Sequence, residues 1–66
     1  MKKISELIIQ LILNDNDFSL DVAKLLGIQQ YSVKELAKRN SDKLANYHVV
    51  MFYLSKGYSL EQIFEA

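Results

Sequence analysis

Apolar residues recur at helical spacing along this chain, in short blocks that polar residues or glycine separate. Ile4, Leu7, Ile8 and Leu11 follow the i, i+3, i+4 pattern of an amphipathic helix. This first block stops at residues 14–17, which are all Asn or Asp and whose side chains favour turns by competing for backbone hydrogen bonds. The pattern therefore predicts short helices rather than one long rod.

Two further helices are expected in the middle of the chain. Ser19 is a good N-cap, and Asp21 would follow it in the first turn, where the helix dipole favours a negative charge. Gly27 would end this second helix, because glycine readily adopts the left-handed conformation that closes a helix. A third helix is predicted from residue 29 or 30 to about Arg39.

The last third of the chain predicts two more helices. One covers residues 44–54, with Asn46 as a candidate N-cap, and ends at Gly57. The spacing of Ser59 and Gln62 then matches a capping box, in which each side chain satisfies a backbone donor of the other residue. No stretch alternates as a strand would. We therefore expect an all-α fold, a compact bundle of about five short helices forming a single domain over the whole chain.

Composition narrows the class of protein. A chain of 66 residues without cysteine cannot use disulfides or thiolate metal sites to reinforce a small core. Well-packed helices or a partner chain must do so, which favours a homodimer. No apolar run reaches the ~20 residues that cross a bilayer. Glu6 and Gln10 interrupt the apolar stretch behind the basic residues Lys2 and Lys3, so we expect an unprocessed cytoplasmic protein with no membrane contact.

Five residue sizes between positions 23 and 36 fit a helix-turn-helix. Ala23 is small enough for two helices to cross closely, and Gly27 allows the sharp turn four residues later. Ile28 is expected to fill the corner behind the glycine. Val33 and Leu36 then fall where the second helix should press against the first.

The segment 22–36 resembles the helix-turn-helix of the phage repressor and Cro family. The flanking helices fit the five-helix layout of that family, and residues 57–65 resemble the closing helix of small phage-type regulators. The resemblance implies a helix-turn-helix over residues 19–39 and sequence-specific binding of double-stranded DNA by a transcriptional regulator. It also implies that the recognition helix, residues 29–39, enters the major groove.

The same resemblance assigns roles to individual side chains. The residues expected to contact bases are Gln29, Gln30, Tyr31, Lys34 and Lys38. The residues expected to contact phosphates are Ser19, Lys24, Arg39 and Lys43. A glutamine such as Gln30 can pair with adenine N6 and N7 together. Glu35 would repel phosphate unless it accepts from cytosine or pairs with Lys38 or Arg39.

The sequence also bears on two other functional classes, a protein-interaction module and an enzyme. The zero net charge and the aromatic residues of the fourth helix suit a protein-interaction module that uses the same fold without DNA. The sequence does not support an enzyme. It has six serines but a single histidine, His48, and no pattern that would bring a nucleophile, a base and an orienting group together. His48 also lacks partners at ligand spacing, so we expect no metal, no cofactor and no small-molecule ligand.

Overall fold

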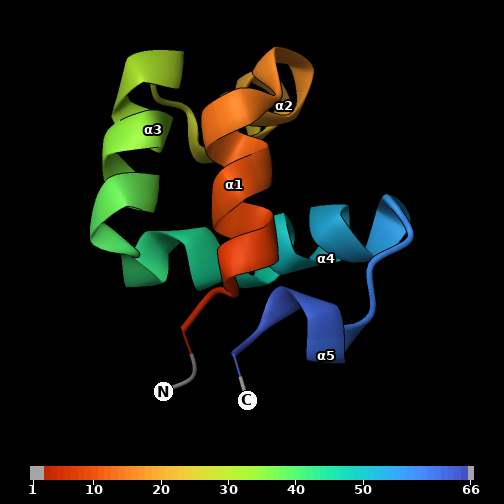
Figure 1. Ribbon diagram of the computed structural model, residues 1–66. Helices are drawn as coiled ribbons and strands as arrows, with labels where there is room; N and C mark the ends of the chain where they lie inside the picture. The colour runs from red at the N-terminus through yellow and green to blue at the C-terminus, as the bar shows by residue number, and fades with distance from the viewer. Residues whose placement is uncertain (1–2, 66) are drawn as a thin grey trace.

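The computed structural model describes residues 3–65, and these form five α-helices and one 3₁₀-helix (Figure 1). Of the basic start, Lys3 is described, whereas Met1 and Lys2 lie outside the described residues. No strand occurs within residues 3–65, which confirms the all-α prediction. The elements are α1 (Glu6–Asn14), α2 (Asn16–Leu26), α3 (Gln30–Arg39), η1 (Asp42–Ala45), α4 (Tyr47–Ser55) and α5 (Leu60–Ile63).

The junction of α1 and α2 is shorter than the sequence predicts. A single residue, Asp15, separates the two helices. Its backbone N–H donates to Leu11 O at the end of α1, while its carboxylate accepts from the Phe18 N–H at the start of α2. The prediction that Ser19 caps α2 is therefore wrong: α2 begins one turn earlier, and Ser19 lies inside it.

Side-chain caps define most of the other helix starts. Ser5 caps α1. Asn46 caps α4 by accepting from the His48 N–H, and this second cap is the one that the sequence predicts. The predicted capping box at Ser59 is present in full. The predicted single helix over 44–54 is wrong at its start, because residues 42–45 form the separate helix η1 before Asn46.

The core lies between α1, α2 and α3, and α4 covers its remaining side. Ile8 and Ile12 of α1 and Val22 of α2 are fully buried in it, as are Val33 of α3 and Val49 of α4. No helix of residues 3–65 combines the length and apolar character needed to cross a membrane.

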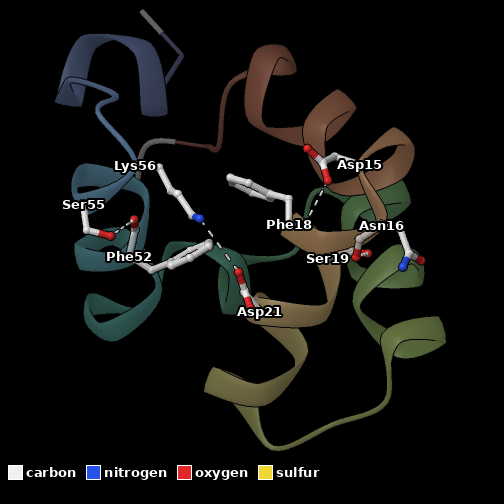
Figure 2. Close-up of polar contacts among 8 residues, drawn as sticks. All are labelled: Asp15, Asn16, Phe18, Ser19, Asp21, Phe52, Ser55 and Lys56. Carbon is white, nitrogen blue, oxygen red and sulfur yellow. Dashed lines mark hydrogen bonds and ion pairs between the residues drawn. The ribbon is translucent and has the colours of Figure 1, made fainter.

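Aromatic side chains join α2 to α4 (Figure 2). The rings of Phe18 and Tyr53 stack with centroids 5.8 Å apart, and Phe52 tilts against Phe18 at 5.2 Å. At the edge of this contact, Lys56 Nζ lies 4.0 Å from Asp21 Oδ2. The buried Tyr53 hydroxyl donates to Leu44 O, so it also anchors η1 beneath the bundle.

The two ends of the described chain lie side by side, as Figure 1 shows. An isolated antiparallel bridge pairs Ile4 with Phe64. The Ser5 N–H donates to Ile63 O at 2.7 Å, and the Glu65 N–H donates to Lys3 O at 2.9 Å. These contacts hold α5 against the start of α1.

Fewer apolar side chains are left over than the sequence suggests. From the sequence alone, five apolar residues are predicted to exceed what the core can enclose and to mark a dimer face: Ile9, Leu13, Met51, Tyr58 and Phe64. Ile9 is buried, and Leu13, Tyr58 and Phe64 pack partly against the core. Of the five, Met51 alone remains largely exposed.

Candidate nucleic-acid interface

Three residues, 27–29, form the turn between α2 and α3. Gly27 has φ 69° and ψ 31°, and its N–H donates to Ala23 O. The Ile28 N–H donates to the same carbonyl at 3.1 Å. This left-handed glycine closes α2, so the chain does not continue as a rod through residue 27. The predicted position of the turn is confirmed.

The inner faces of α2 and α3 carry the expected residues. Ala23, Val33 and Leu36 are all buried where the two helices pack together. Ile28 differs from its prediction: 38% of its surface is exposed, and it lines a groove beside α3 instead of filling the corner. The corner is already closed by the two backbone hydrogen bonds to Ala23 O.

A polar network ties the start of α3 to the start of α2. The Gln30 amide nitrogen lies 2.6 Å from Asn16 Oδ1 and 2.7 Å from Ser19 Oγ. Ser19 Oγ in turn donates to Asn16 O at 2.9 Å, a contact visible in Figure 2. The hydroxyl therefore accepts from Gln30, and the network fixes the orientation of the amide. Gln29, which precedes α3, offers no side-chain cap, so this network anchors the helix start.

The network changes what two predicted contacts can do. Ser19 has no exposed surface, so it is withdrawn from the phosphate-contacting set. Both amide hydrogens of Gln30 already have protein acceptors, so only Oε1 is left for a ligand. Paired contact with adenine N6 and N7 needs the amide nitrogen as well, and Gln30 cannot make it in this conformation.

The outward side of α3 is polar and open to solvent. Tyr31 is 71% exposed, and Lys38, about two turns further along the same side of the helix, is exposed as well. Lys34 and Glu35 are half-buried between them. These residues lie opposite the buried Val33, as the 3.6-residue period of the helix requires. Gln29, just before the helix, is exposed as well.

Positive charge dominates this face. The helix carries three cations and one anion: Lys34, Lys38, Arg39 and Glu35. Glu35 makes no ion pair within residues 3–65, so neither Lys38 nor Arg39 neutralises it there. The nearby Glu35 carboxylate raises the pKa of Tyr31 above its ordinary value, because it favours the protonated hydroxyl as a donor and repels the phenolate charge.

An open groove of about 550 Å³ runs along one flank of α3. Arg39 and Lys43 supply its two cations, which brings together two of the predicted phosphate contacts. The exposed Lys24 does not line the groove. The other lining residues are Leu26, Ile28, Tyr31, Ser32, Glu35, Leu36 and Asn46.

Sequence reasoning missed Asn16, which holds Gln30. The residue stands in a run of four Asn and Asp residues that predicts a loop, and its partner lies 14 positions away. No local signal reveals such a pairing. Among the described residues, no group of three potential ligands could hold a metal ion.

Comparisons with protein-family models, with curated proteins and with solved structures gave no match for this chain. The geometry of α2, the turn and α3 is therefore the basis for inferring a function.

Proposed function

We propose that the chain is a small DNA-binding regulator that resembles the phage repressor and Cro family and that inserts α3 into the major groove. One observation carries the proposal. The polar side of α3 is exposed to solvent. The left-handed Gly27 sets the corner before this helix, and the contacts of Gln30 with Asn16 and Ser19 fix its first turn. An α-helix with a free side of this kind fits the width of the major groove.

Each exposed side chain of α3 has a distinct role in this proposal. Lys34 reaches guanine O6 or N7, and Tyr31 contacts a thymine methyl or a phosphate. Lys38 extends the same row one turn further along the groove. Gln30 contributes Oε1, which accepts from an exocyclic amine of adenine or cytosine. Gln29 stands at the entry to the groove.

The groove beside α3 suits the phosphate backbone. Arg39 and Lys43 lie together there, and Lys24 lies on the exposed side of the last turn of α2. Contacts of this kind set the position of the protein on the duplex without reading its sequence. Because the chain has no net charge, its affinity for DNA depends on the clustering of lysine and arginine side chains at this end of the molecule.

Selection from random duplexes, followed by anisotropy titrations over a range of salt concentrations, tests the proposal. Lys34→Gln should weaken binding to the selected site, relax the preference at one base position and reduce the salt slope by about 1. Lys56→Gln is the matched control, because it removes the same charge from an exposed pair with Asp21 on the α4 side of α2. It should bind like the wild type.

The protein-interaction module remains the alternative function, favoured by the exposed apolar side of α4. It makes the opposite prediction for the same titrations. No binding to any duplex at low salt, or equal effects of the Lys34 and Lys56 substitutions, would remove the DNA proposal.

A further inference from the structure

The groove beside α3 has an apolar part that a phosphate contact does not need. Leu26, Ile28 and Leu36 form this part of the lining, and Tyr31 borders it. Ile28 is 38% exposed and Tyr31 71%. Phosphates bind cations through charge and offer nothing apolar to cover these side chains. An apolar hollow with a few polar groups is the usual form of a binding site, so the groove suits a ligand that is itself partly apolar.

The charges of the groove lie in a definite order along α3. Ile28 stands two residues before the helix, so the apolar end is at the helix start. Arg39 is the last residue of the helix and Lys43 follows in η1, so the cationic end is at the helix end. Glu35 lies between the two ends, half-buried and without an ion pair within residues 3–65. A row of phosphates would meet Glu35 with a like charge, so a duplex can use only the cationic end.

The length of the groove fits a short extended segment of chain. Tyr31 and Arg39 are eight residues apart on α3, a distance of about 12 Å. A helix about 10 Å across would fill roughly 900 Å³ over that length, more than the 550 Å³ of the groove. An extended chain advances about 3.3 Å per residue and turns alternate side chains to the same side. Two of its side chains four positions apart therefore reach both ends of the groove.

We propose that this groove binds an extended segment of another protein in which a bulky apolar residue and an Asp or Glu stand four positions apart. The apolar side chain packs on Leu26 and Ile28, and the carboxylate pairs with Arg39 and Lys43. The residue midway between them faces Glu35, which favours a hydrogen-bond donor or a basic side chain there and excludes a second acid.

The polar groups of the groove fit a peptide backbone. Asn46 uses its side-chain oxygen to cap α4, so its amide nitrogen can donate to a peptide carbonyl, and Glu35 can accept from a peptide N–H. The apolar body of a small organic acid would instead cover Glu35 without giving it a hydrogen bond. Tyr31 and Arg39 are also of two types that are enriched at the centres of protein interfaces.

The segment and DNA compete for this end of the molecule. Both need Arg39 and Lys43, so an occupied groove removes two phosphate contacts from a bound duplex. This competition alone rests on the proposed DNA function; binding of the segment does not. Two side chains separate the activities, because Ile28 lines the groove and has no assigned DNA contact, whereas Lys38 faces the duplex and does not line the groove.

Selection from a library of random short peptides, without DNA, tests the proposal. The enriched peptides should share an acidic and a bulky apolar residue four positions apart. In anisotropy titrations with one labelled peptide of this set, Arg39→Gln and Ile28→Ser should each raise the dissociation constant at least about tenfold. Lys38→Gln and Leu7→Ser are the matched controls, since they remove an exposed charge and an exposed apolar side chain outside the groove. Both should bind the peptide like the wild type.

A change of preference cannot come from a damaged fold. The double variant Arg39→Glu, Lys43→Glu should select peptides with Lys or Arg in place of the acid and with the same apolar residue. Enrichment of no peptide by the wild type, enriched peptides without an acid, or an acidic preference retained by the double variant would overturn the proposal. Ile28→Ser should leave the DNA titration unchanged, so failure of peptide binding can be told apart from failure of the proposed DNA function.

Discussion

Substitution of Gly27 isolates the contribution of one backbone conformation to stability. Gly27 lies at φ 69° and ψ 31°, in the left-handed region. A Cβ placed there meets no atom within 4 Å, so the first side-chain carbon suffers no collision with its neighbours. The cost comes from the backbone alone, about 1–2 kcal/mol for an ordinary residue.

The expected order of stability is glycine, asparagine, alanine, valine. Alanine should lower the free energy of unfolding by about 0.5–1.5 kcal/mol. The cost is less than the full backbone strain, because alanine also restricts the unfolded chain and this offsets part of the strain. Asparagine tolerates the left-handed region and should cost less, whereas β-branched valine should cost about 2–3 kcal/mol. For a domain of this size each kcal/mol lowers Tm by about 4–8 °C.

Urea and thermal unfolding of the three variants give the required free energies. The comparison of asparagine with valine is decisive, because both add a side chain and only their backbone preferences differ strongly. If the asparagine and valine variants were equally stable, or if valine matched the wild type, the left-handed corner would be refuted and the helix-turn-helix with it.

Three further substitutions test other parts of the fold. Ala23→Leu should destabilise the protein by about 1–3 kcal/mol by overpacking the crossing of α2 and α3, and an unchanged denaturation midpoint would contradict that crossing. Asp15→Ala should cost about 1 kcal/mol by removing the cap of α2, whereas Asp17→Ala, which removes a charge from the same turn without removing a cap, should cost less in the same urea titration. Burial raises the pKa of Tyr53, so the folded state holds its proton more tightly and stability should fall as the pH rises above about 10. Tyr53→Phe should flatten that fall, and an unchanged slope of unfolding free energy against pH would show that Tyr53 does not cause it.

Much of the fold can be predicted from the sequence because its signals are local. The capping box at Ser59 and the cap at Asn46 depend on residues two or three positions away. Gly27 and Ala23 are separated by one turn of helix, so their spacing alone predicts the corner. These three predictions, which depend on near neighbours in the chain, are confirmed.

Two of the errors arise where a distant partner decides the outcome. A serine such as Ser19 serves equally well as a cap or as a buried acceptor, and only Gln30, 11 positions away, distinguishes the two roles. The amide of Gln30 is drawn away from its predicted pairing by the same contact. The error at Asp15 is local: its backbone bonds to the end of α1 and its side chain caps α2, so one residue separates the two helices, which a count of turn-forming residues does not reveal.

The contact between the two ends of the described chain has a consequence for the order of folding. The Ser5 hydroxyl donates to Gln62 O across 57 positions, so this contact at the start of α1 forms only after residue 62 has been synthesised. The corner between α2 and α3 needs only neighbours in the chain and can form earlier. A chain that stops before residue 60 should therefore still form the corner, while the start of α1 lacks this anchor.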